Sequence, residues 1–251
     1  KAAILWEVNT PWSVEEIELD PPKPGEVLVK IAASGMCHSD EHLMTGDLPF
    51  ALPIIGGHEG AGVVQEVGEG VSWLAPGDHV VFGFIPSCGR CPSCSTGHSN
   101  LCDLGALMGL GRQIDGTARH HAKGTDLGLM CMLGTFAHHT VVNEASCIKI
   151  ENDLPLDKAC LLGCGVVTGW GSAVYAADVQ PGDMVAVVGC GGIGSNAIQG
   201  GKLAGAAVIA AIDPIEFKRE KAMEFGATVT HASIQDALAA LPEDTWSRGF
   251  D

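Results

Sequence analysis

The stretch Val188-Gly189-Cys190-Gly191-Gly192-Ile193-Gly194 decides how the second half of this chain folds. Its spacing is GxGxxG, and it stands between an apolar run at 185–188 and a segment with helical character at 193–204. In that position the first glycine makes the turn, the second lets a pyrophosphate reach the helix N-terminus, and the last permits close packing. A plain structural turn is the competing interpretation, and the flanking strand and helix disfavour it. We therefore predict a dinucleotide site at Gly189, Gly191, Gly192 and Gly194.

The next strand supports this prediction, because residues 207–212 are followed directly by Asp213, about twenty positions after the glycines. An acidic side chain there accepts hydrogen bonds from the adenosine ribose, and its charge repels a 2′-phosphate. Asp213 therefore favours NAD over NADP, and we expect Lys218 near the same ribose. Strand alternates with helix through this half, which is typical of a parallel α/β sheet. The predicted segments are helices at 156–162, 166–176, 193–204 and 217–225, and strands at 185–188, 207–212 and 228–230.

The first half is rich in short strands. Runs of Val, Ile and Phe predict them at 2–8, 27–31, 62–67, 79–84, 139–142 and 147–150. Short strands at this spacing predict a compact barrel or sandwich. Residues 88–136 look irregular, with many Gly, Ser and Asp. The change of pattern places the domain boundary at Gly165, which gives a β-rich domain at 1–165 and an α/β domain at 166–251.

The composition excludes several classes of function. The chain has 251 residues and a net charge of −16, which would repel a phosphate backbone, so we expect no nucleic-acid binding. No apolar run approaches the ~20 residues of a membrane-spanning helix, and the start of the chain resembles a strand rather than a signal peptide. Ten cysteines without a secretion signal favour metal binding over disulfides. We therefore expect a cytoplasmic protein.

Four cysteines form the strongest single motif, Cys88-x2-Cys91-x2-Cys94-x7-Cys102. Four thiolates in a short irregular lobe can close a tetrahedral zinc site without an open position. Such a site anchors a lobe, here 88–102, that has no core of its own. An iron–sulfur cluster is the rival interpretation, but the x7 gap and the absence of a proline after the last cysteine fit it poorly. We therefore predict a structural zinc.

A second possible metal site is dispersed along the chain. His58 stands beside Glu59 in a glycine-rich segment, and taken alone this pair is more typical of a polar turn. Cys37 and Cys164 are single cysteines, for which a buried small residue is the ordinary interpretation. Together, however, the three residues supply two sulfurs and one nitrogen. That donor set leaves zinc an open position, as catalytic sites require.

Four motifs in one order connect these sites to a known family. They are Gly57-His58-Glu59-Gly60-Ala61-Gly62, the four-cysteine lobe, Gly163-Cys164-Gly165 with Thr168-Gly169, and the Gly189 to Gly194 turn. The chain resembles the zinc-containing alcohol dehydrogenases of the medium-chain dehydrogenase/reductase superfamily, with similarity to an actinobacterial nicotinoprotein branch. The resemblance implies a GroES-like catalytic domain followed by a Rossmann NAD-binding domain. It also implies two zinc ions per chain and an alcohol or aldehyde substrate.

The resemblance assigns the catalytic zinc to Cys37, His58 and Cys164, with Glu59 behind the metal and Asp40 supporting the histidine. In such enzymes the metal lowers the pKa of the alcohol hydroxyl, and a hydride passes to C4 of the nicotinamide.

The resemblance also assigns a proton path and cofactor contacts. Ser39 matches the hydroxyl that takes the alcohol proton, and His42 matches the histidine that passes it to solvent. Thr168 matches a position beside the nicotinamide. His38 stands where many relatives carry an arginine that meets the cofactor pyrophosphate. A histidine is only partly charged near pH 7, so we expect cofactor affinity to depend more on pH here.

Several alternatives remain within this interpretation. NAD either exchanges at each turnover or stays bound, as in the nicotinoprotein branch. A thiol-dependent formaldehyde dehydrogenase is a further alternative function within the family. A non-catalytic, nucleotide-binding member of the fold is the alternative from another class of protein. Relatives also continue past residue 251, so we expect a longer chain that forms a homodimer or homotetramer.

Overall fold

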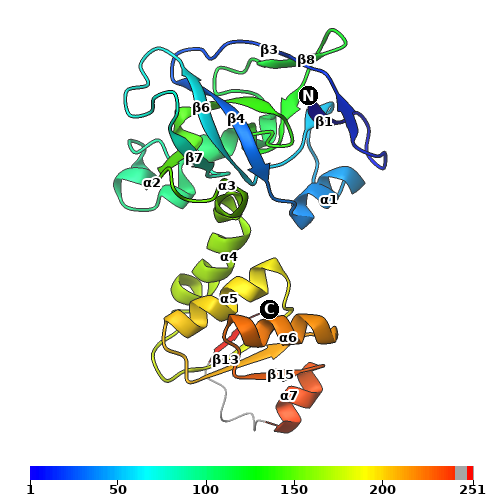
Figure 1. The fold of residues 1–251 in the computed structure, drawn as a ribbon, viewed down its shortest axis with the longest axis vertical. Helices are drawn as coiled ribbons and strands as arrows, with labels where there is room; N and C mark the ends of the chain where they lie inside the picture. The colour runs from blue at the N-terminus through cyan, green and yellow to red at the C-terminus, as the bar shows by residue number, and fades with distance from the viewer. Residues whose placement is uncertain (241–247, 251) are drawn as a thin grey trace. The chain divides into compact units, whose positions relative to one another are not determined.

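The computed structural model describes residues 1–240 and 248–250, and it divides the chain into two compact units (Figure 1). The first unit is Lys1–Cys164 and the second is Gly165–Asp251. Each unit has its own hydrophobic core.

A five-stranded antiparallel sheet forms the centre of the first unit. In spatial order its strands are β11 (His139–Asn143), β4 (Glu26–Ser34), β6 (Gly60–Val67), β7 (His79–Phe82) and β12 (Cys147–Ile150). Valines recur on one face of these strands, and Val29, Val64 and Val80 are almost fully buried together with Phe82. β-branched side chains favour this pleated, half-buried setting.

Shorter strands complete the first unit. A second sheet has the order β10 (Gly128–Leu129), β5 (Ile54–Ile55), β1 (Ala2–Leu5) and β2 (Ser13–Glu15), and a third has β3 (Glu18–Leu19), β8 (His120–Ala122) and β9 (Thr125–Asp126). The segment 88–136 is therefore less irregular than its sequence indicates. Strands of two or three residues leave no alternating pattern, which explains why the sequence did not reveal β8 to β10.

Helical segments of the first unit are short. The α-helices are α1 (His38–Thr45), α2 (Pro92–Ser95) and α3 (Leu156–Ala159). Single turns or short runs of 3₁₀-helix cover Ser99–Leu101, Asp103–Leu110, Met130–Met132, Glu144–Ser146 and Cys160–Gly163.

The second unit is a parallel sheet with helices packed against it. The strand order is β15 (Val229–His231), β14 (Val208–Ile212), β13 (Met184–Val188) and β16 (Arg248–Phe250). The helices are α4 (Gly165–Gly171), continued by a π-helical turn at Ser172–Ala176, then α5 (Gly192–Leu203), α6 (Glu216–Phe225) and α7 (Ile234–Ala240). After β13 the chain forms β14 and β15 on one side of that strand, and later β16 on its other side. A nucleotide-binding sheet has its switch point at such a strand.

Within the described residues no single helix is long and apolar enough to cross a membrane. Leu156–Gly163 and Gly165–Ala176 meet the length and composition criterion only when they are taken together as a bent pair.

Candidate functional site

The glycine-rich segment around His58 packs closely against the segment that contains Thr135. Gly57 has φ +87°, and a Cβ built on it would lie 2.4 Å from Thr135 Oγ1. A Cβ on Gly60 would lie 2.7 Å from Thr135 Cγ2. The Thr135 amide donates to the Gly57 carbonyl over 3.0 Å. The glycines on both sides of His58 and Glu59 are therefore required by this close approach, and His58 projects from a tightly fixed backbone.

Cys37, His58 and Cys164 converge in the first unit. Their donor atoms all lie within 4.8 Å of one another, and His58 and Cys164 are buried. Cys37 is the N-cap of α1, and Cys164 directly follows the 3₁₀ turn Cys160–Gly163. Two sulfurs and one imidazole nitrogen at this separation match the donor set of a zinc site that keeps one position open. The residues present therefore fit a catalytic zinc.

Asp40 connects the two loops that carry these ligands. Its Oδ2 accepts a hydrogen bond from the Cys37 amide over 3.0 Å, and its Oδ1 accepts one from the Gly57 amide over 3.0 Å. The same Oδ1 lies 3.6 Å from His58 Nδ1, which is ion-pair distance rather than a hydrogen bond. Asp40 is 3% exposed, so its charge acts with little screening by solvent.

The environment of the ligand set favours positive charge. Burial lowers the pKa of His58, but Asp40 and the Cys164 sulfur outweigh burial and raise that pKa to about 10. For Cys37 burial acts in the opposite direction and raises the pKa. The Ser39 amide and hydroxyl and the charge of His58 outweigh burial, so the pKa of Cys37 lies below its ordinary value. Surroundings that stabilise an imidazolium and a thiolate also suit a divalent cation.

The four cysteines of the lobe form a second donor set. The Sγ atoms of Cys88, Cys91, Cys94 and Cys102 lie within 4.8 Å of one another. Backbone amides point at these sulfurs, with Cys91 N 3.4 Å from Cys88 Sγ and Cys94 N 3.4 Å from Cys91 Sγ. The amides of Arg90 and Cys91 lower the pKa of Cys88 to about 6, whereas burial raises that of Cys102 to about 11. Four sulfurs fill a tetrahedron, so this site fits a structural zinc.

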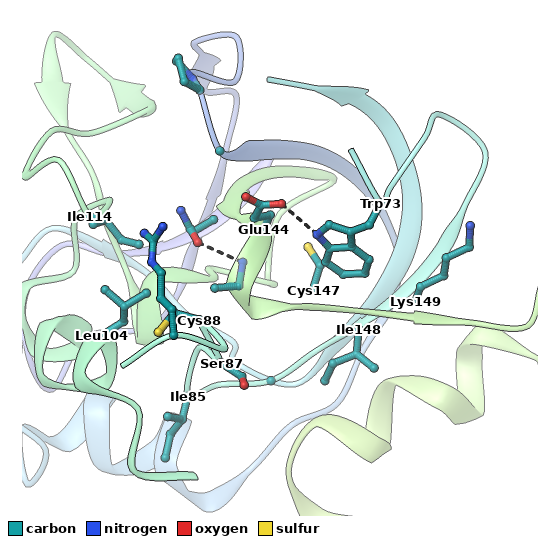
Figure 2. Close-up of a pocket in the computed structure, with 16 residues that line it drawn as sticks. Trp73, Ile85, Ser87, Cys88, Leu104, Ile114, Glu144, Cys147, Ile148 and Lys149 are labelled. Atoms are coloured by element: carbon teal, nitrogen blue, oxygen red, sulfur yellow. Dashed lines mark hydrogen bonds between the residues drawn. The ribbon is translucent and has the colours of Figure 1, made fainter. Parts of the chain in front are cut away.

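Two cavities flank the metal sites. A cavity of about 830 Å³ lies beside the four-cysteine lobe, where Trp73 Nε1 donates to Glu144 Oε2 over 2.8 Å (Figure 2). A second cavity, of about 720 Å³, reaches Cys37 and Asp40. Its lining is mainly apolar and includes Trp12, Met36, Met44 and Phe136. Nothing in the sequence pattern indicated either cavity, because their walls come from distant segments.

The structure places the predicted proton-path residues on α1. Ser39 Oγ lies 3.6 Å from the sulfur of Cys37. His42 lies one turn further on, with Nδ1 3.4 Å from Asp47 Oδ2, and it is exposed. The ring of His38 is 4.8 Å from that of His42, and its Nε2 is 3.5 Å from Glu41 Oε2. Ser39 is therefore brought to the ligand set, while both histidines stand on the exposed face of the helix.

The Gly189–Gly194 turn has the close packing that its sequence predicted. Gly189 has φ +86°, and a Cβ on Gly194 would lie 1.8 Å from the Gly189 carbonyl oxygen. Gly191 is the N-cap of α5, and Gly192 begins the helix. A Cβ on either of these two would meet no atom within 4 Å, so space is open above the turn. The turn thus offers backbone amides at a helix N-terminus to an anion.

Asp213 closes the same turn. Its Oδ2 accepts from the Cys190 amide over 2.9 Å, its Oδ1 accepts from the Ile215 amide over 2.9 Å, and Lys218 Nζ lies 4.0 Å from Oδ2. Burial raises the pKa of Asp213, but these two amides and the charges of Lys218 and Arg219 lower it overall. The carboxylate is therefore ionised at neutral pH. Thr168 lies in α4, where its carbonyl accepts from Ser172 Oγ over 2.7 Å.

Comparisons with known proteins agree with this geometry. Residues 23–152 match the family model for the alcohol dehydrogenase GroES-like domain. An NDMA-dependent alcohol dehydrogenase from Amycolatopsis methanolica is 53% identical over 251 residues, which are 100% of this chain and 68% of that protein.

Two solved structures share the fold. Benzyl alcohol dehydrogenase from Acinetobacter calcoaceticus has a TM-score of 0.88 at 32% identity, over 97% of this chain and 67% of that one. Acetophenone reductase from Geotrichum candidum, in complex with NAD, has a TM-score of 0.75 at 28% identity, over 92% of this chain and 63% of that one.

Together with the fold, these likenesses place the chain among the medium-chain dehydrogenases and reductases. Within that superfamily it belongs to the zinc-containing alcohol dehydrogenases. The sequence-based predictions of a GroES-like unit, a Rossmann-type sheet and two zinc-type donor sets are confirmed. The roles of single residues remain predictions.

Proposed function

We propose that this enzyme oxidises primary alcohols to aldehydes, and catalyses the reverse reaction, with NAD as the hydride acceptor. The convergence of Cys37, His58 and Cys164, with the hydroxyl of Ser39 against one of the sulfurs, carries this proposal. A donor set of this kind leaves one coordination position for substrate oxygen.

The three ligand residues would hold the catalytic zinc, which supplies a Lewis acid that lowers the pKa of an alcohol hydroxyl. Ser39 accepts the proton that leaves the alcohol, and His42 passes it to solvent. Asp40 fixes the loop of Cys37 relative to the loop of His58 through two amide hydrogen bonds. The four cysteines at 88–102 hold the structural zinc.

The second unit binds the cofactor in this proposal. The amides around Gly189, Gly191 and Gly194 receive the pyrophosphate, and Asp213 receives the adenosine ribose. Because the pKa of Asp213 is lowered, its negative charge disfavours the 2′-phosphate of NADP. The preference is measured directly by comparing kcat/KM for NAD and NADP.

A second mode of cofactor use has support from one comparison. The relative from Amycolatopsis methanolica is described as NDMA-dependent, and it is 53% identical to this chain. In the corresponding mode here, the nucleotide stays bound, and the NADH formed by alcohol oxidation is reoxidised to NAD by a second substrate. Denaturation of freshly purified protein would then release about one nicotinamide nucleotide per chain. Protein that carries none, and that turns over only with added NAD, would show ordinary exchange instead.

One experiment tests the proposed function as a whole. A panel of primary alcohols is assayed with NAD, with NADP, and with NDMA as electron acceptor in the absence of added nucleotide, alongside zinc analysis. The proposal predicts two zinc ions per chain and turnover of primary alcohols. Activity on formaldehyde only in the presence of a thiol would instead favour the thiol-dependent alternative. One zinc per chain and no turnover of any alcohol would favour the non-catalytic alternative.

Assembly and location are further parts of the proposal. We expect a homodimer or homotetramer, which light scattering tests on the full-length enzyme. The many unpaired cysteines suit the reducing conditions of the cytoplasm.

A further inference from the structure

The carboxylate of Glu59 occupies the space where a side chain at position 35 would stand. Glu59 is 3% exposed. A Cβ built on Gly35 would lie 1.9 Å from Glu59 Oε2, 2.6 Å from its Cδ and 3.0 Å from its Cγ. Unbonded carbon and oxygen atoms do not approach so closely, so any side chain at position 35 must displace the carboxylate or the loop.

Hydrogen bonds fix the backbone of Glu59 relative to the same loop. The Gly35 amide donates to the Glu59 carbonyl over 2.8 Å, and Ser34 Oγ donates to that carbonyl over 2.9 Å. A hydroxyl has one hydrogen to donate. Ser34 therefore accepts in its 2.7 Å contact with Thr135 Oγ1, and Thr135 is the donor. With the backbone held in this way, a clash at Gly35 can be relieved mainly by moving the Glu59 side chain.

Glu59 lies next to a residue of the proposed zinc site, so the position of its carboxylate can affect metal binding. It directly follows the ligand His58, and Gly35 lies two residues before the ligand Cys37. Among the described residues, the mutually close donor set consists of Cys37, His58 and Cys164, without the carboxylate of Glu59. A buried negative charge just outside a ligand set changes how strongly the set holds a cation, and the effect depends on distance.

We propose that Gly35 is a positioning residue for this charge: the absence of a side chain at position 35 sets where the Glu59 carboxylate stands, and thereby how firmly the neighbouring site retains zinc. This inference rests on the proposed zinc site at Cys37, His58 and Cys164. It concerns the retention of the metal, which is measured independently of turnover.

The test is a double-mutant cycle on the full-length enzyme with Gly35→Ala, Glu59→Gln and both changes together. Release of zinc to a chromophoric chelator is followed, and the phase that belongs to the four-cysteine site serves as an internal reference. In Gly35→Ala we expect the other zinc to leave about tenfold faster, as is typical when the outer support of a metal site is disturbed. Glu59→Gln keeps the shape of the side chain and removes its charge. If position 35 acts by placing that charge, Gly35→Ala will have almost no effect on zinc release when it is combined with Glu59→Gln.

Simple overpacking predicts another pattern. In that case Gly35→Ala would accelerate zinc release equally in the wild-type enzyme and in the Glu59→Gln variant, and this result would overturn the proposal. A release rate unchanged in Gly35→Ala would do so as well. Gly109→Ala is the matched control, because a Cβ there meets no atom within 4 Å and the backbone is not in the left-handed region.

Two further outcomes are distinguishable. If Gly35→Ala does not fold, Gly35→Ala with Glu59→Asp should fold and hold both zinc ions, because a side chain one carbon shorter removes the atoms that make the 1.9 and 2.6 Å contacts; failure of this pair contradicts the proposal. A wild-type enzyme that holds zinc only at the four cysteines would instead refute the proposed catalytic site, before position 35 is considered.

Discussion

Asp40 shows how one residue can serve the backbone and the metal site together. Each of its two oxygens accepts an amide hydrogen bond, from Cys37 and from Gly57, and one of them also faces His58. The N-terminal turn of α1 and a loop 17 residues away are thus tied to one buried carboxylate. The resemblance implied only support of the histidine, and the structure adds a capping hydrogen bond from the Cys37 amide while keeping Asp40 close to the imidazole.

Replacement of Asp40 by asparagine should therefore weaken both functions. The amide group keeps one oxygen, so one of the two backbone amides faces an NH₂ group and loses its acceptor, which costs about 1–3 kcal/mol. The loss of charge beside His58 should lower zinc affinity at this site by about 10- to 100-fold. Urea denaturation and competition with a chelator measure the two effects. Unchanged zinc affinity with reduced stability would show that Asp40 acts only as a cap.

At this scale the sequence predicted the ligands but not what holds them. Cys37, His58 and Cys164 were found because each residue type has metal chemistry and each lies in a motif that resembles the family's. Ser34, Gly35 and Thr135 carry no such signal. Their importance comes from an approach between segments far apart in the chain, with Thr135 between Gly57 and Gly60, and only the folded structure reveals it.

The four-cysteine lobe is the element whose structure depends most on metal. Its α2 helix and its 3₁₀ turn Ser99–Leu101, and the adjoining 3₁₀ segment Asp103–Leu110, contain no buried side chain. Packing alone therefore offers little to hold the lobe, and ligation must supply the stability. The spacing of the cysteines was enough to predict the site, although it gave no indication of the 3₁₀ segments.

Removal of one ligand from the lobe should have local effects. In Cys91→Ser we expect one zinc per chain instead of two, and amide exchange in residues 88–110 at least about tenfold faster. Amides of β4, β6 and β7 should keep their protection, because the valine core of that sheet contains no lobe residue. Hydrogen exchange measured by mass spectrometry, together with zinc analysis, tests this. Ser95→Ala, in the same lobe, should retain two zinc ions, and two zinc ions in Cys91→Ser would contradict the assignment.

Element boundaries followed the strength of the local pattern. Strands with several β-branched residues, such as β12 and β14, lie within one residue of their predicted positions. The first strand ends at Leu5 rather than Val8, because a turn begins at Glu7. Strands β5 and β10 are only two residues long; β10 pairs with β5, and β5 pairs in turn with β1. They are defined by these long-range pairings, so no local signal could have revealed them.

At the scale of the whole molecule, two cores and a strongly acidic composition set the response to conditions. The net charge is −16, and acid would reduce this charge while protonating the buried histidines. His120 in β8 is the extreme case, because it is 0% exposed and neither ring nitrogen makes a hydrogen bond within the described residues. His120 is therefore a structural residue of the core rather than a solvated one.

His120 should make the fold sensitive to mild acid. Burial, followed by the charges of His121 and Arg119, lowers its pKa from 6.5 to about 3. A histidine with a depressed pKa binds its proton more readily in the unfolded chain, so its contribution to stability is lost as pH falls from about 6.5 towards about 3. Between pH 7 and pH 5 this amounts to about 2 kcal/mol. His120→Phe should remove that part of the pH dependence, and it should leave stability at pH 7 equal or higher because two unpaired nitrogens leave the core.

The measurement is the free energy of unfolding from urea titrations at pH 7 and pH 5, with wild type and His120→Phe compared at equal zinc content. His121→Phe is the matched control. His121 lies next to His120 but forms ion pairs with Asp20 and Asp126 at 3.1 and 2.9 Å, and its pKa is raised. A raised pKa stabilises the fold at the lower pH, so this control should increase the loss of stability between pH 7 and pH 5. If both variants lost stability as the wild type does, neither histidine would control the acid response, and protonation of the metal ligands would become the main cause.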